Sequence, residues 1–195
     1  MKKLNYLLMV AVAALAFQAC NNGPKDAKET ADSLNKTKDT TSNAMNTGGI
    51  AVTNDDAKFA TDAAVAGMAE VALGKLALEK TANAQIKDFA NMMVADHSKA
   101  NDELMAIAKQ KNITLPTTVD EEHQKKMDDL SKKSGAEFDK AYADAMVDGH
   151  KKVLDMMKGE ADNGSDAELK AFASKTAPVV QTHLSAIEKI HDSMK

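Results

Sequence analysis

The chain has 195 residues and a formal net charge of −4, with 25 basic residues, all of them lysine, against 29 acidic residues. Its single cysteine excludes a disulfide scaffold and a zinc site built from cysteines. An acidic chain without basic runs also lacks the electrostatic footprint of a nucleic-acid-binding protein. The length fits one ordinary domain with appendages.

The N-terminus has the pattern of a targeting signal. Two lysines precede an apolar stretch, Leu7 to Phe17, that is too short to span a bilayer, and Ala19 then precedes Cys20. This arrangement resembles a bacterial lipoprotein signal, in which residues 1–19 are removed and the cysteine is lipidated. We therefore expect an exported protein that contacts the membrane through lipid on Cys20, at the outer membrane or on the periplasmic side of the cell envelope. A cleaved secretory signal with an incidental cysteine is the alternative.

Residues 20–50 lack the composition of a folded segment. They hold no aromatic residue, mix lysines with acids, and are dense in Asn, Thr, Ser and Gly. Such a stretch buries too little apolar area to offset the entropy lost on ordering. It is predicted to be a disordered tether, with a marginal helix around residues 27–38 as the competing interpretation.

From residue 51 onward the apolar residues recur with helical spacing. The expected helices are 54–82, 84–111, 119–132, 135–161 and 166–194. Three pairs have the spacing of capping boxes at helix starts: Thr118 with Glu121, Ser134 with Glu137, and Ser165 with Glu168. The predicted fold class of residues 51–195 is all-α, an antiparallel four-helix bundle with the short helix in the connection between the second and third long helices.

One polar residue interrupts the apolar seam of each long helix. Glu70, His97, His150 and His183 occupy these four positions. Bundle proteins assemble metal sites from such inward-facing side chains, so the four are candidate ligands of one transition metal ion. A metal-free polar network in the core is the alternative.

The spacing of these residues ranks them as candidate ligands, and their donor atoms limit the choice of ion. Glu70 and His97 are nearly equidistant from Asn83, whereas His183 lies 20 residues after Asn163 and His150 only 13 before it. That mismatch of about 10 Å makes His183 the weakest member. The donor set suits copper, zinc, iron or manganese.

Two methionines tilt this choice slightly towards copper. Met93 and Met146 each precede a seam histidine by four residues, which places a thioether one turn from an imidazole on the same helix face. Ordinary core packing by methionine is the alternative.

The sequence contains no signature of a known reaction. A valine stands three residues before each of His97, His150 and His183, so the Glu-x-x-His motif of di-iron proteins is absent. No phosphate-binding glycine loop, metalloprotease motif or hydrolase nucleophile motif occurs either. We therefore expect a binding or structural protein, with an enzyme only as a branch of the metal hypothesis.

Several segments together resemble one known family. They are EVALGKLALEKTANAQIKDFANMMVADHSKANDEL at 70–104, LP at 115–116, DGHKKVL at 148–154 and APVVQTHL at 177–184. The chain is similar to the bacterial secreted domain-of-unknown-function family 4142. The resemblance implies a ferritin-like four-helix bundle, an export or lipoprotein signal, and motif positions at Glu70, His97, His150 and His183. It implies no activity.

Two functions therefore remain open at this point. One is a membrane-tethered, exported bundle that binds a transition metal ion in its core. The other is a metal-free structural or interaction module of the cell envelope. Metal analysis of the purified protein distinguishes them, because only the first requires the four seam residues to share an ion.

The lipid anchor gives the first testable prediction. Replacing Cys20 with serine should release the protein from the membrane fraction, because the lipid has no other thiol to modify. Fractionation and mass spectrometry of the mature N-terminus measure both effects. A mature chain that begins elsewhere, or an unchanged membrane association of the variant, would refute the expectation.

Overall fold

The structure is a computed structural model, and it describes residues 26–39, 50 and 52–194. Residues 1–19 and Cys20, with the signal and lipidation site expected there, lie outside the described residues. All regular secondary structure within the described ranges is α-helical. None of the helices in these ranges combines the length and hydropathy that crossing a membrane requires.

Four long helices form a bundle. They are α3 (Asn54–Lys80), α4 (Ala84–Gln110), α6 (Gly135–Asn163) and α7 (Ala167–Asp192). Each begins and ends within two residues of its predicted limits. The short helix α5 (Glu121–Ser131) lies in the connection between α4 and α6, as predicted. The all-α fold class and the bundle are therefore confirmed.

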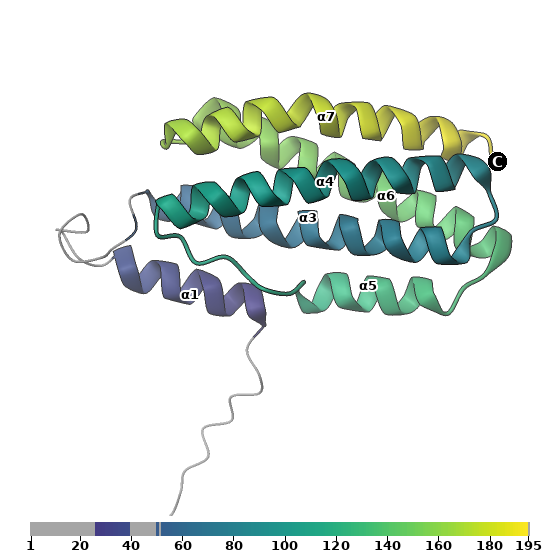
Figure 1. The fold of residues 1–195 in the computed structure, drawn as a ribbon, viewed down its shortest axis with the longest axis horizontal. Coiled ribbons are helices and arrows are strands. Elements are labelled where there is room, and N and C mark those ends of the chain that lie inside the picture. Colours follow the sequence, from purple (N-terminus) through teal and green to yellow (C-terminus); the bar gives the residue numbers. More distant parts are fainter. Residues whose placement is uncertain (1–25, 40–49, 51, 195) are drawn as a thin grey trace, which may run out of the picture.

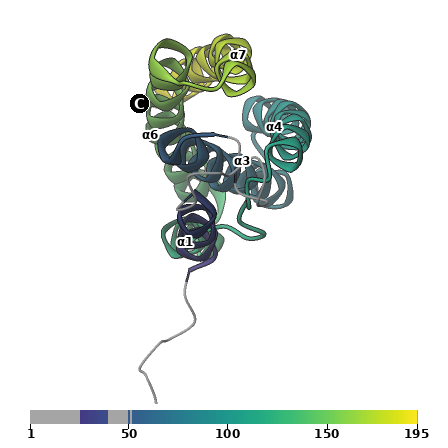
Figure 2. The same ribbon diagram turned by 90° about the vertical axis from the view of Figure 1, so that its left-hand side faces the viewer.

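The connection through α5 makes the neighbouring helices of the bundle antiparallel. The hairpins α3–α4 and α6–α7 pack against each other through α4 with α7 and through α3 with α6. Between the hairpins the chain returns along the outside of the bundle, so that α6 begins at the end of the bundle where α4 began (Figure 1). An end-on view shows the four helices surrounding one common core (Figure 2).

Aspartate and asparagine side chains begin three of the helices. Asn83 accepts hydrogen bonds from the first turn of α4, and Asp120 and Asp166 do so for α5 and α7. The predicted capping boxes at Thr118 and Ser165 are therefore wrong, because an aspartate nearer to each helix takes the position. Ser134 does precede α6, but its side chain makes no capping bond. A carboxylate caps as well as a hydroxyl does and also interacts favourably with the helix dipole.

Small side chains on α3 allow α4 to approach closely. A Cβ atom on Gly74 would lie 2.9 Å from Val94 Cγ2 and 3.2 Å from the Ala90 carbonyl oxygen. The other residues along the seams of the four long helices are buried or partly buried, with one exception on α7. Val179 is exposed, and its neighbour Val180 is fully buried instead. The inward-facing positions of α7 are spaced four residues apart from 172 to 176 and from 176 to 180, and then three residues apart to His183.

Helix α1 (Ala27–Asp39) lies in the segment predicted to be disordered. It packs along α3, in line with α5 on the same side of the bundle (Figures 1 and 2). Buried Asn35 donates to the Thr114 carbonyl oxygen (2.9 Å) and accepts from the Thr114 amide (2.7 Å). The prediction of disorder is therefore wrong for 27–39, where the helix of the competing interpretation forms. The paired hydrogen bonds between the Asn35 side chain and the Thr114 backbone add stability that its few apolar residues do not provide.

Two acidic residues meet at one end of the bundle. Asp56 at the start of α3 and Glu160 at the end of α6 are both buried. Asp56 accepts from the Ser165 amide (2.9 Å) in the turn that joins α6 to α7. Burial and the neighbouring Asp56 raise the pKa of Glu160 to about 7. The pair therefore favours a protonated Glu160 in the folded state.

A Glu160→Gln variant tests the effect of this pair on stability. A raised folded-state pKa adds stability that is fully present below the unfolded pKa and is lost as pH rises through about 7. The amide of glutamine mimics the protonated acid at every pH, so the variant should match the wild type at pH 5 and melt higher at pH 8. Thermal denaturation measures this, with exposed Glu79→Gln as the control. An equal pH dependence of wild type and variant would contradict the assignment.

Candidate metal centre

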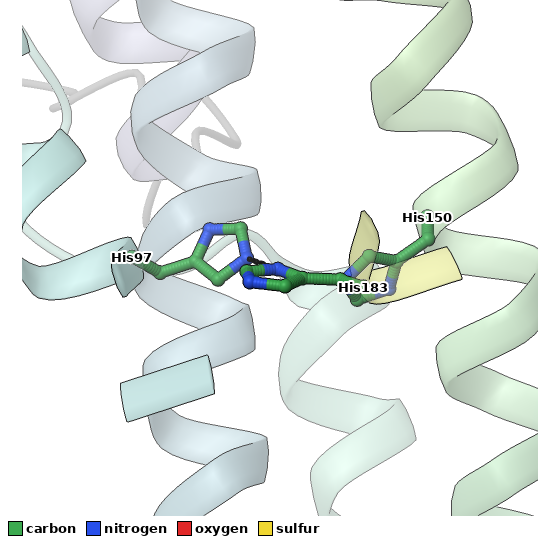
Figure 3. A group of neighbouring side chains, drawn as sticks. All are labelled: His97, His150 and His183. Carbon is green, nitrogen blue, oxygen red and sulfur yellow. Dashed lines mark hydrogen bonds between the residues drawn. The ribbon is translucent and has the colours of Figure 1, made fainter. Parts of the chain in front are cut away.

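The four polar seam residues meet in the middle of the bundle. Each comes from a different long helix, and each is at most 6% exposed. One ring nitrogen from each of His97, His150 and His183 lies within 4.8 Å of the other two. Figure 3 shows the three rings converging from separate helices.

His97 and His183 are held by carboxylates on their outer sides. Asp96 Oδ2 lies 2.9 Å from His183 Nε2, and Glu70 Oε2 lies 2.9 Å from His97 Nδ1. The Glu70 oxygen lies out of line with the N–H direction, so this second contact is electrostatic rather than a well-aligned hydrogen bond. The inner nitrogens, His97 Nε2 and His183 Nδ1, are 3.2 Å apart.

His150 completes the cluster from α6. Its Nδ1 donates to the carbonyl oxygen of Met146, one turn earlier (2.8 Å), which leaves Nε2 without a hydrogen-bond partner among the described residues. The ring of Phe89 lies 6.0 Å from that of His150 and 6.4 Å from that of His183, measured between centroids. An aromatic wall of this kind keeps the imidazoles out of contact with water.

Burial shifts the protonation equilibria of the cluster. It lowers the pKa of His150, and it lowers the pKa of His183 although Asp96 acts in the opposite direction. Burial alone would raise the pKa of Glu70, but His97 and the other imidazoles outweigh this and lower it. The favoured state is an ionised Glu70 beside neutral His150 and His183.

These contacts leave nitrogen lone pairs facing one another. His97 Nδ1 must carry a hydrogen, because a bare nitrogen would face a carboxylate oxygen at 2.9 Å. His183 Nε2 carries one for the same reason, since it contacts Asp96. In neutral rings the inner nitrogens of both residues are therefore unprotonated, and a cation between these two lone pairs, 3.2 Å apart, would relieve their repulsion.

The geometry of the inner nitrogens fits a metal ion in that position. Two nitrogens at about 2.0–2.1 Å from one tetrahedral ion are about 3.3 Å apart, close to the 3.2 Å between His97 and His183. In metal sites the second nitrogen of a histidine ligand usually donates to a carboxylate or carbonyl; His150 and His183 have such an acceptor here, and the second nitrogen of His97 faces the Glu70 carboxylate.

Glu70 and His183 lie differently in the structure from the positions that the sequence predicts. Glu70 lies beside His97 and is not one of the three side chains whose ligand atoms converge. His183 is a central member, and its expected displacement of about 10 Å is wrong. Counted from the observed helix ends, the later residue of each pair, His97 or His183, lies only three residues farther from its turn than its partner does. A stagger of three residues is only about 4.5 Å along each hairpin, which the side chains span.

Three further side chains bear on the site or its surroundings. Asp96 was not predicted as part of the site. Its side chain is 45% exposed, so it lies off the buried seam from which the candidate ligands were identified. Its position next to His97 in the sequence was the only available signal. His123 and His191 lie outside the cluster; each is partly buried and contacts a carboxylate, Asp120 (2.5 Å) and Asp144 (2.6 Å) respectively.

Comparison with known proteins places the chain in a family. The model of a domain of unknown function, DUF4142, matches residues 39–190, so the chain belongs to that family. The histidine cluster and the four long helices, apart from the last two residues of α7, lie within the match, whereas α1 precedes it except for its last residue. No curated protein and no solved structure matches the chain.

A His150→Leu variant tests whether the metal-free cluster is costly. A buried acceptor without a partner costs about 1–3 kcal/mol, and leucine removes it while filling similar space. In chelator the variant should therefore unfold at a higher urea concentration than the wild type. Met146→Leu, a volume-conserving change at a neighbouring buried residue, is the control. A less stable His150→Leu variant would show that the imidazole is already satisfied in the metal-free protein.

Proposed function

We propose that this DUF4142 member binds a single transition metal ion between His97, His150 and His183. Glu70 and Asp96 orient the rings and offset the charge of the ion. Three converging, buried imidazole nitrogens carry the proposal, because His150 Nε2 has no hydrogen-bond partner among the described residues and the inner nitrogens of His97 and His183 have only each other. Neutral imidazoles suit zinc, copper, iron and manganese to different degrees.

The ligand set favours a site that exchanges its ion or its fourth ligand. Structural zinc sites are closed by four protein ligands, whereas three histidines leave one position of a tetrahedral ion for another ligand. The bundle is also built to fold without metal, because a continuous apolar core surrounds the cluster on every helix. We therefore infer a role in holding, buffering or sensing a metal ion, at the cell envelope if Cys20 carries lipid.

Metal titration of the full, chelator-treated chain tests this proposal. Zinc and copper(II) should each bind with a stoichiometry of one, measured by calorimetry, and should raise the melting temperature. Asp96→Asn should weaken binding about 10- to 100-fold, the usual effect of removing a group that orients a metal ligand. Alanine at His97, His150 or His183 should weaken it further, because each change removes a ligand.

The chain provides matched controls for these variants. His123 and His191 also contact carboxylates but lie outside the cluster. Alanine at either position should leave the metal affinity unchanged. Equal affinity for the wild type and the three cluster variants would reject the site. An absence of binding by the wild type would instead favour a metal-free structural or interaction module.

A further inference from the structure

A second feature of the bundle lies directly beside the histidine cluster. A cavity of about 190 Å³ opens between α3, α5 and α6, on the side of the molecule where α5 lies. Its walls are mostly small or apolar side chains: Ala66, Ala69, Leu73, Ala145, Met146, Val153 and Met156. Small-molecule sites have this character, a mainly apolar hollow with a few polar groups at fixed positions.

The buried end of this cavity is a carboxylate that lacks aligned partners. Glu70 lines the cavity, and only 6% of the residue is exposed. Neither of its oxygens accepts a well-aligned hydrogen bond from the described residues. Burying such a group is costly unless a donor reaches it. A hydroxyl or ammonium group entering the cavity would supply that donor without displacing the imidazoles.

Two lysines at the mouth of the cavity make no close ion pair with other described residues. Lys126 on α5 makes no ion pair among the described residues, and Lys152 on α6 is 4.0 Å from Glu122. Both side chains of that pair are more than 70% exposed, so their contact contributes little. Asp62 also lines the mouth, but Lys28 and Lys58 neutralise it.

A glycine lies in the wall of the cavity. Gly149 lines it from the middle of α6, and a Cβ atom there would meet nothing within 4 Å. Glycine inside a helix costs about 0.5–1 kcal/mol relative to alanine. No close helix contact requires glycine at this position, and a larger side chain here would occupy space that the cavity now holds.

We propose that this cavity binds a small, mainly apolar molecule with an acidic group at one end and a hydrogen-bond donor at the other. The acidic group contacts Lys126 and Lys152, and the donor contacts Glu70. This inference deepens the proposed function, because the ligand would then lie one side chain away from the metal-binding imidazoles. Its binding to the cavity does not itself require a metal.

Three probes with six-carbon chains test the two polar contacts of this proposal separately. They are 6-hydroxyhexanoate, hexanoate, which lacks the donor, and hexane-1,6-diol, which lacks the charge. Nuclear magnetic resonance titration of the full chain, with zinc and with chelator, measures their affinities. The hydroxy acid should bind roughly tenfold more tightly than either analogue, because each analogue loses one polar contact. Shifted signals should include those of Gly149 and Met156.

Two pairs of variants test where the probes bind. Gly149→Leu fills the cavity and should weaken 6-hydroxyhexanoate binding at least tenfold, whereas Gly159→Leu, at an exposed glycine of the same helix, should not. Lys126→Gln should weaken binding of the two acids and spare the diol. Lys125→Gln, whose exposed lysine pairs with Asp129 outside the cavity, is its control.

The results distinguish this inference from the proposed function. Zinc binding without probe binding, or equal affinity for all three probes, overturns the cavity proposal and leaves the metal site standing. Probe binding that Gly149→Leu abolishes, in a chain that binds no metal, supports the cavity and overturns the metal site. Probe binding that neither Gly149→Leu nor Lys126→Gln changes places the probe elsewhere and overturns the cavity proposal.

Discussion

The contact between the inner nitrogens of His97 and His183, 3.2 Å apart in a dry core, is the interaction on which the organisation of the site depends. Two carboxylates fix the hydrogens of these rings on their outer sides, so the inner sides are left electron-rich. A cation between them would relieve the repulsion. The packing of the surrounding helices holds this contact in place.

The bundle holds the cluster through the packing of its two hairpins. Small residues on α3, including Gly74, let α4 approach closely, and this sets the distance between Glu70 and His97. Phe89 packs against the rings of His150 and His183 and thereby links the two hairpins. The cluster therefore lies where all four helices meet, and a relative shift of the hairpins would separate His97 from His183. Metal binding should accordingly stabilise the docking of the two hairpins most strongly.

Several buried polar residues of this chain lower the stability of the folded state. The unpartnered nitrogen of His150, the carboxylate of Glu70 and the acidic pair Asp56–Glu160 are all buried against the general preference for apolar cores. An extensive set of apolar residues on the same helices compensates for them. Buried polar groups that weaken a fold are commonly retained for a function, and three of these four residues lie outside any helix-capping role. Asp56 differs, because it anchors the turn before α7 through Ser165.

The sequence by itself determined the helices and the four polar seam positions. Helical spacing of apolar residues is a local signal, and a polar residue at a seam position points into the core whichever helices surround it. Glu70, His97, His150 and His183 were therefore identifiable before any packing was known. The limits of the long helices were predictable to within two residues for the same reason, although the capping residues Asp120 and Asp166 were assigned to their neighbours.

Only the tertiary structure decided the roles of these residues. The height of each residue depends on where its helix ends and how the two hairpins dock, so counting residues from Asn163 overestimated the height difference between His150 and His183. Glu70 lies beside a ring instead of among the converging nitrogens, and Asp96 joins from a partly exposed position, because both depend on side-chain directions across helices. The order of α1 depends likewise on the backbone of Thr114, which is 79 residues distant from Asn35 in the chain. No local pattern contains such a contact.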